Sequence, residues 1–490
     1  MLIKPLGRTV VRPPVLLVPK WKELTAYTQD GILKVTGSNN CYKLLQKLEK
    51  NTLYVSNSLK DLLLTTGSQY WQAELWKGHV TSMSLDGTRV KVNSLRRILD
   101  GVEGDENRFN AILELLGWLG SRGVPPGSIS GMAWSLWRST LESPISLAFD
   151  GDIGREAFYG GRQEATPGIY KDMVALDISS AYPFEMASRP YAGTLRQVSI
   201  RTEINPHQAG LAVATVRIPD DLPHSPLPIR LSEDLIQWRK GELAGSWTWT
   251  ELDAAKKLGA EITIIKNYAP LTEVDPFSSW WEVVRDGRKS LSPSAAKLVK
   301  SLSNSLWGMF GMTGDDRGLV RWTDDLGYNQ ELIGRNPKRL PQSNTAHIAA
   351  ETTSRVRVRM LLEGLYGGKN QAPNYPVHID TDGIIIPADS IKNFNLEMIG
   401  DKSGQWRAKQ VINKIEVKAS QLYRYSCGSN CVKAHNWHYV ASGMTEGRAR
   451  DYFEKTPKGF KMTVNQAETD LKLNRELAKV EVRRMNISPN

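Results

Sequence analysis

The hydrophobic positions of this chain form two kinds of pattern, short continuous apolar runs and longer segments with helical spacing, which together predict a mixed α/β protein. The continuous runs are typical of buried strands, and they are residues 15–18, 53–55, 173–176, 211–216 and 262–265. The helix-spaced segments are residues 109–119, 250–257, 294–308, 346–366 and 464–485. Apolar residues 377–379 and 384–386 flank an acidic turn and predict a hairpin, whereas polar residues 312–345 predict a loop or small insertion.

Size and composition indicate a globular protein of several domains with a polyanionic partner. A chain of 490 residues suggests about two to four domains, and 40% hydrophobic with 23% charged residues is ordinary for a soluble protein. No apolar stretch long enough for a membrane span is present, and the start lacks the apolar core of a signal peptide. Three cysteines fit a reducing compartment, and a net charge of +11 favours a partner such as nucleic acid.

Three aspartates stand where predicted strands end. Asp177 follows the apolar run 173–176, and Asp380 and Asp382 lie in the turn of the predicted hairpin. Carboxylates from separate strands suit two-metal phosphoryl transfer, because Mg²⁺ prefers oxygen ligands and two such ions clamp the attacking and leaving oxygens. Asp177 and Asp382 are the expected main ligands and Asp380 the supporting one, although each segment alone would also make a good turn or helix cap.

Two further features fit a nucleotide substrate. Tyr182, five residues after Asp177, is placed to pack under an incoming sugar and to clash with a 2′-hydroxyl, unless it is only a core tyrosine. Lys300 and Asn304 share one helix face with Trp307, where a cation can neutralise charge on a triphosphate. Lys297 continues that face, with a solvated surface lysine as the alternative.

These segments resemble the motifs of the family B DNA polymerases, specifically the protein-primed branch of bacteriophages and linear plasmids. Residues 177–183 are similar to motif A, D-x-x-S-x-Y-P, and residues 300–308 to motif B, with Trp307 where tyrosine is usual. Residues 380–383 are similar to motif C, D-T-D-S, with Gly383 in place of serine. The resemblance extends over about residues 150–455.

Two weaker motifs of that family also have counterparts. The four residues Phe158, Tyr159, Gly160 and Gly161 resemble the Y-x-G-G segment that contacts template. Tyr423 matches the tyrosine of K-x-Y beside the primer terminus, but Gln421 replaces its lysine, and Lys418 or Arg424 remains as a source of the missing charge.

The resemblance implies a right-hand polymerase with palm, fingers and thumb, preceded by a degenerate RNase H-like exonuclease domain. The implied domains are an exonuclease-like domain at 1–150, palm at 151–190 and 346–445, an insertion of the terminal-protein-region type at 191–278, fingers at 279–311, a second insertion at 312–345 and thumb at 446–490.

The exonuclease motifs are incomplete. Asn57 and Asp61 fit the second motif and Asp105 is a plausible third, but no D-x-E pair precedes them. Glu23 and Asp30 are the acidic residues available there, and unless one of them substitutes, we expect no proofreading.

The implied activity is template-directed DNA synthesis, with two Mg²⁺ ions (or Mn²⁺), a DNA template-primer and dNTPs, and the primer hydroxyl is expected from a terminal protein or from a nucleic-acid end. Arg288 or Lys289 is the expected further triphosphate ligand, and Thr381 is expected near DNA. The location would be the cytoplasm, that of the host if a phage encodes the chain. The alternatives are a template-independent nucleotidyltransferase and a non-catalytic nucleic-acid-binding replisome protein.

Zinc binding by the cysteines and histidines within 427–438 is a further, less favoured hypothesis because their spacing matches no common zinc motif.

Overall fold

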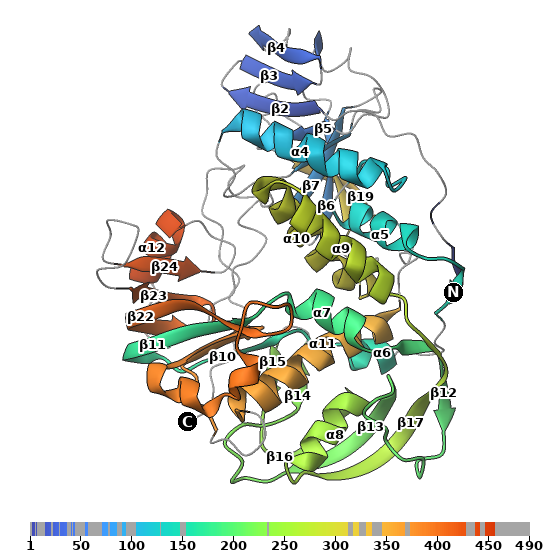
Figure 1. The fold of residues 1–490 in the computed structure, drawn as a ribbon, viewed down its shortest axis with the longest axis vertical. Coiled ribbons are helices and arrows are strands. Elements are labelled where there is room, and N and C mark those ends of the chain that lie inside the picture. Colours follow the sequence, from blue (N-terminus) through green and yellow to red (C-terminus); the bar gives the residue numbers. More distant parts are fainter. Residues whose placement is uncertain are drawn as a thin grey trace. The chain divides into compact units, whose positions relative to one another are not determined.

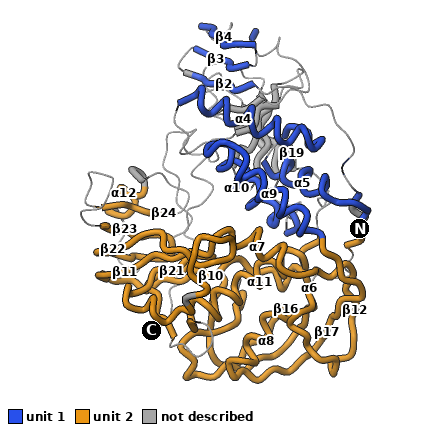
Figure 2. Tube along the Cα trace, viewed as in Figure 1, with its two compact units in different colours: residues 1–145, 276–344, 466–480 blue, residues 146–275, 345–465, 481–490 orange. Residues whose placement is uncertain are grey.

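The computed structural model describes most of the chain between residues 104 and 455 and a part of what precedes it (Figure 1). The described residues are 2–4, 6, 15–20, 23–28, 30–36, 41, 43–44, 54–56, 71–76, 79–85, 91–94, 104–127, 129–147, 153–232, 235–311, 317–322, 330–335, 345–367, 373–427, 437–441 and 446–455. They form two compact units, one from the ranges 1–145 and 276–344 and the other from 146–275 and 345–465 (Figure 2). No helix among the described residues is long and apolar enough to cross a membrane.

The first unit is built on a sheet of nine strands in the order β19-β18-β6-β7-β8-β5-β2-β3-β4. The strands are β2 (Val15–Lys20), β3 (Glu23–Thr28), β4 (Gly31–Thr36), β5 (Tyr54–Ser56), β6 (Trp71–Trp76), β7 (His79–Leu85), β8 (Lys91–Ser94), β18 (Arg317–Trp322) and β19 (Gln330–Arg335). Strand β5 pairs in parallel with β2 and β8, and the other pairs are antiparallel. The predicted strands at 15–18 and 53–55 are confirmed, with the second beginning one residue later.

The segment 312–345 is more than the loop that its polar composition predicts. It contains the hairpin β18–β19, and β18 pairs with β6 over Arg317–Arg321, so this part of the chain extends the sheet of the N-terminal region. The hairpin fits the small insertion that the sequence allowed, but its pairing with β6 was not predicted, because the partner lies more than 200 residues earlier and local composition carries no signal of it.

Four helices pack in the first unit, and their aromatic residues form its core. They are α4 (Asp105–Gly120), α5 (Ile129–Ser139), α9 (Ser278–Ser290) and α10 (Pro293–Phe310). Trp137 of α5 lies against the rings of Phe277 and Phe310, at centroid distances of 5.7 and 5.1 Å, and donates from Nε1 to the Pro276 carbonyl at 2.7 Å. Large aromatic contacts of this kind hold the segment that contains α9 and α10 to the N-terminal region.

The start of α10 illustrates how sequence sets its boundary. Ser292 is the N-cap and accepts from the Ala295 amide, and Pro293 occupies the first helical position, where its fixed φ suits the helix. Glu114 of α4 accepts from the Ser292 amide at 2.7 Å and from its hydroxyl. A carboxylate at this end also complements the helix dipole, so α4 and α10 are joined at the N-terminus of α10.

The second unit contains an antiparallel sheet of seven strands in the order β10-β20-β21-β11-β22-β23-β24. The strands are β10 (Arg162–Ala165), β11 (Gly168–Ile178), β20 (His378–Thr381), β21 (Gly383–Pro387), β22 (Trp406–Ala419), β23 (Leu422–Ser426) and β24 (His438–Ala441). Met173, Ile385, Ile412 and Ile415 form its apolar core, which confirms the buried run at 173–176 and the hairpin at the acidic turn.

The segment between α7 (Ala181–Ser188) and α9 forms a separate sheet with its own core. Its order is β12-β17-β13-β16, with a small hairpin β14–β15 beside it. The elements are β12 (Tyr191–Val198), β13 (Leu211–Ile218), β14 (Pro228–Ser232), β15 (Leu235–Trp238), β16 (Gly241–Thr248), α8 (Trp249–Lys257) and β17 (Glu261–Val274). Helix α8 begins with a capping box formed by Thr248 and Glu251, and Trp247 and Trp249 are buried in the core around it.

Helix α11 (Ala346–Arg359) crosses the second unit and is almost wholly buried. It continues as a turn of π-helix at Met360–Leu365, which the sequence pattern merged into one helix. The remaining short elements are β1 (Leu2–Ile3), β9 (Ile145–Ser146), α6 (Ile153–Glu156), α7 (Ala181–Ser188), two 3₁₀ segments (Ala388–Asn393 and Leu396–Met398) and α12 (Glu446–Lys455). The predicted helix at 464–485 lies outside the described residues.

Candidate active site

Two adjacent strand ends bring Asp177 and Asp382 together. Asp177 is the next-to-last residue of β11 and lies opposite Gly383, the first residue of β21. The Ile178 amide donates to the Asp382 carbonyl at 2.8 Å, which fixes the acidic turn against the end of β11. A Cβ on Gly383 would lie 3.3 Å from the Leu176 carbonyl oxygen, so the strands approach closely at this point.

Asp177 is buried, with 6% of its surface exposed, and two cations of β22 lie against it. Lys409 Nζ is 2.7 Å from Asp177 Oδ2, and Arg407 Nε is 3.7 Å from Oδ1. Oδ1 itself has no hydrogen-bond partner. A buried carboxylate oxygen without a hydrogen bond is costly, and such an atom is expected where a ligand completes the site.

Asp382 is held in an electrostatically unfavourable position. Burial raises the pKa of its carboxyl to about 6, with Asp177 and Asp380 adding repulsion and Lys409 partly offsetting it. A cluster of carboxylates with too little positive charge is a mark of functional sites.

Asp380 has a different role in the geometry. Its Oδ1 accepts hydrogen bonds from the amide side chains of Gln163 at 3.3 Å and Gln421 at 3.0 Å, and from the Thr381 hydroxyl at 3.2 Å. Asp380 Oδ1 therefore accepts hydrogen bonds from protein donors, whereas the Asp177 carboxylate forms ion pairs with Lys409 and Arg407.

The donor set of Asp177 and Asp382 fits a hard divalent ion. Mg²⁺ is usually bound by one or two carboxylates together with waters and substrate phosphates, rather than by an all-protein cage. No group of three or more His, Cys, Asp or Glu side chains that could hold a metal ion occurs in the described part of the chain. The Asp177 oxygen without a hydrogen bond and the charge at Asp382 are the observations that support the fit.

Tyr182 lies beside these carboxylates. It is on α7, is 9% exposed, and its pKa is raised by burial and by the nearby negative charge of Asp382 and Asp380. The turn before α7 requires Ser180 in the left-handed region, with φ +54°. Tyr182 therefore lies within the electrostatic influence of Asp380 and Asp382, and its contact with an incoming sugar stays a prediction.

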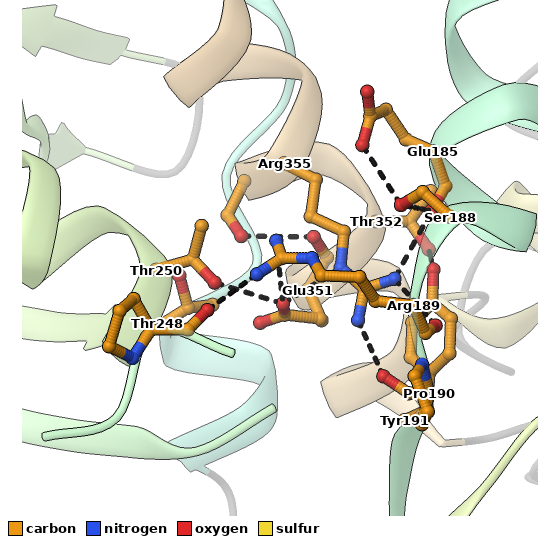
Figure 3. Close-up of polar contacts among 12 residues, drawn as sticks. Glu185, Ser188, Arg189, Pro190, Tyr191, Thr248, Thr250, Glu351, Thr352 and Arg355 are labelled. Carbon is orange, nitrogen blue, oxygen red and sulfur yellow. Dashed lines mark hydrogen bonds and ion pairs between the residues drawn. The ribbon is translucent and has the colours of Figure 1, made fainter. Parts of the chain in front are cut away.

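A buried polar network fixes α7 and the following turn on α11 (Figure 3). Arg355 of α11 donates to the carbonyls of Glu185, Arg189 and Pro190 at 3.1, 3.0 and 2.7 Å. Its Nε also bonds Glu351 Oε1 at 2.9 Å. One fully buried guanidinium thus satisfies three backbone carbonyls and orders the helix that carries Tyr182.

In the segment 158–161 the two aromatic side chains are packed in the interior, and the two glycines differ in how closely other atoms approach them. The Tyr159 ring is 2% exposed and belongs to the core of the insertion, and the contact of this segment with template stays a prediction. Phe158 is also packed, against a second core cluster. An added Cβ on Gly160 would meet no atom within 4 Å, whereas a Cβ on Gly161 would lie 2.6 Å from Thr381 Cγ2, so Gly161 allows the close packing of Thr381.

At the other end of the site, Tyr423 packs on His378 with ring centroids 4.7 Å apart. Neither basic residue considered as a replacement for the K-x-Y lysine is free to serve. Lys418 is buried with its ammonium on the Phe453 carbonyl, and Arg424 pairs with Glu416 and Glu454. Gln421 instead turns inward with φ +58° and donates to Asp380, so this hydrogen bond takes the place of a charge.

The face of α10 that is expected to bind nucleotide belongs to the first unit. Lys300 and Asn304 are exposed and Trp307 is partly exposed on the same face, as the helical spacing predicted. At the end of α9, Lys289 is exposed and Arg288 is half-buried. These positions leave the face accessible to a ligand.

Several predicted residues are outside the site. Asn57 and Asp61 lie outside the described residues, as do Cys431 and His435. Asp105 is the first residue of α4, where it pairs with Arg108 at 3.1 Å. Cys427 Sγ lies 3.5 Å from His438 Nε2. Sequence reasoning missed Gln163, Arg407 and Lys409, which belong to no motif of the resemblance.

Comparisons with known proteins agree with this geometry. Residues 128–353 match the family model described as DNA polymerase type B, organellar and viral. A DNA polymerase of Kluyveromyces lactis is 22% identical over 356 residues, which cover 62% of this chain and 35% of that protein. The chain thus spans about a third of the length of this curated relative.

Two solved structures of phi29 DNA polymerase share the fold. The complex with primer-template DNA and incoming nucleotide has a TM-score of 0.69 at 10% identity, and the orthorhombic crystal form a TM-score of 0.66 at 11%. Both alignments cover 90% of this chain and 94% of phi29 polymerase. By this sequence match over residues 128–353, the chain is similar to the family B DNA polymerases of the organellar and viral type, and its fold is that of phi29 DNA polymerase.

Proposed function

We propose that this protein is a template-directed DNA polymerase that extends a primer 3′-hydroxyl with deoxynucleotides. The observation that carries the proposal is the pair Asp177 and Asp382, two carboxylates from neighbouring strand ends, with an Asp177 oxygen that lacks a hydrogen-bond donor. The match of residues 128–353 to the type B DNA polymerase model and the similarity to a DNA polymerase of Kluyveromyces lactis support the same activity.

In the proposed reaction the primer oxygen attacks the α-phosphate, the bond to the β-phosphate breaks, and pyrophosphate leaves. Two divalent ions, when bound, supply Lewis-acid activation of the attacking hydroxyl and neutralise the triphosphate. Asp177 and Asp382 hold them, and the Asp380 carboxylate, with its amide donors, supports the turn between β20 and β21. Lys300 on α10 and a basic partner at 288–289 bind the triphosphate.

Two finer properties belong to the proposal. The absence of a D-x-E pair before Asn57 supports a polymerase without proofreading, whose N-terminal region serves to carry the fingers helices. The fold of phi29 polymerase and the insertion at 191–278 support protein-primed initiation, with a terminal protein as primer.

Tyr182 is expected to select the sugar of the incoming nucleotide. Tyr182→Val should lower the preference for dNTPs over NTPs by about 10- to 100-fold, because it removes the ring that would clash with a 2′-hydroxyl. Tyr182→Phe, which keeps the ring, should retain the preference. The two kcat/KM ratios are measured by single-nucleotide extension, and equal ratios in both variants would remove Tyr182 from this role.

The proposed activity is tested by extension of a labelled primer on gels. We expect template-dictated dNTP addition with Mg²⁺ or Mn²⁺ that is lost in Asp177→Asn, and a mismatched primer that stays intact without dNTPs. Addition without template would indicate a terminal transferase instead. If no primer is extended, a reaction supplied with a protein bearing a free hydroxyl distinguishes protein priming from a protein that only binds nucleic acid.

A further inference from the structure

The contact between Lys409 and Asp177 is not explained by the roles assigned so far. Lys409 Nζ lies 2.7 Å from Asp177 Oδ2, although the lysine side chain is 54% exposed and the aspartate 9%. An exposed lysine is not needed to make this strand pairing, because β11 and β22 are held by their backbone register from Gly168–Val417 to Ile178–Trp406. The ammonium of Lys409 therefore forms an ion pair with a carboxylate that is also a proposed metal ligand.

The charges around this contact explain why an ammonium is attracted there. Lys409 also acts electrostatically on Asp382, so both proposed ligands are exposed to its field. Arg407, two residues earlier on the same strand, points its Nε at the other Asp177 oxygen from the longer distance of 3.7 Å. Without a divalent ion, these two cations are the groups that neutralise the carboxylates.

We propose that Lys409 is an internal counter-ion that occupies a coordination position of Asp177 and must leave it before a divalent ion binds. Because the side chain is half-exposed and flexible, the ammonium can swing away at little cost. It then meets the negative charge that accompanies the ion, the polyphosphate of the nucleotide. Lys409 thereby makes metal loading depend on the presence of a triphosphate, an inference that rests on the proposed polymerase function.

The test measures Mn²⁺ binding to the protein alone, through the electron paramagnetic resonance signal of the free ion. Lys409→Met is expected to bind Mn²⁺ about tenfold more tightly than the parent protein without nucleotide, because the competing charge is gone. Adding a non-hydrolysable dNTP should tighten Mn²⁺ binding strongly in the parent and much less in Lys409→Met. The part of the signal that Asp177→Asn removes defines binding at this site.

Matched variants separate the competing charge from simple loss of structure. Lys409→Arg keeps a cation and should bind Mn²⁺ like the parent, whereas Arg407→Met should change the affinity less than Lys409→Met, since its charge lies farther from the carboxylate. Lys409→Gln is a second neutral variant, and circular dichroism checks the fold of each.

Unchanged or weaker Mn²⁺ binding in both neutral variants would overturn the inference, even if the protein polymerises DNA. A parent protein that binds no Mn²⁺ sensitive to Asp177→Asn, and extends no primer, would instead refute the polymerase proposal itself. The two failures are therefore distinguishable.

Discussion

Asp382→Asn is expected to abolish nucleotide addition and at the same time to make the metal-free protein more stable at neutral pH. The loss of a metal-binding charge should lower kcat by at least about a thousandfold, since each lost factor of ten corresponds to about 1.4 kcal/mol of transition-state stabilisation. The gain in stability follows because ionised Asp382 lies among other carboxylates in a partly buried site.

The sign of the stability effect follows from the pKa of Asp382, which the fold raises from 3.8 to about 6. The folded protein therefore binds this proton more tightly than the unfolded chain, and ionised Asp382 destabilises the fold above pH 6. The cost at pH 7.5 is on the order of 3 kcal/mol. It shrinks as the pH falls from about 6 to about 4, and it disappears below about pH 3, where the carboxyl is protonated in both states. Asparagine resembles the protonated form at every pH.

The measurement is chemical denaturation of both proteins in EDTA at pH 7.5 and pH 4.5. The stability advantage of Asp382→Asn over the parent should fall from about 3 kcal/mol at pH 7.5 to about 1 kcal/mol at pH 4.5. Asp389→Asn, at an exposed position beyond β21, serves as control and should change stability at neither pH. A variant that is less stable than the parent at pH 7.5 would show that Asp382 is not held against electrostatic repulsion.

The main carboxylates could be predicted from sequence because the physical signal is local. An apolar run that ends in Asp177, and a hairpin turn that contains Asp382, each place a carboxylate at a strand end, and antiparallel pairing of β11 with β21 joins them. The cap and the proline at the start of α10 are similarly local, which is why the face that carries Lys300 and Asn304 was predicted correctly.

What the sequence did not reveal depends on contacts between distant segments. Lys409 meets Asp177 because β22 pairs with β11 across more than 220 residues, and no motif marks that register. The Tyr159 ring is buried because the insertion that follows it supplies a core around it. Hairpin β18–β19 pairs with β6 in the same non-local way. The segment 312–345 that contains the hairpin is polar, so the sequence alone did not reveal this pairing.

Arg357 anchors the segment 159–161, and its replacement is expected to destabilise the protein strongly. Its Nη1 donates to the carbonyls of Tyr159 and Gly160, each at 2.8 Å, and Nη2 pairs with Glu251 Oε1 at 2.7 Å. Glu251 belongs to the capping box of α8, so one buried guanidinium ties this segment to the insertion. Removing one partner of a buried pair leaves an uncompensated charge, at a cost of about 3–5 kcal/mol.

Arg357→Lys tests the role of this anchor, because lysine keeps the charge but cannot reproduce the planar fork that reaches both carbonyls and Glu251. We expect lower stability together with weaker binding of primer-template DNA. Arg355→Lys is the matched control, since Arg355 is equally buried on the same helix but bonds the carbonyls of Glu185, Arg189 and Pro190. Both variants should lose stability in denaturation, and DNA affinity, measured by fluorescence anisotropy, should fall further in Arg357→Lys. Equal DNA affinities at equal stability would mean that Arg357 supports the fold without positioning the segment for DNA.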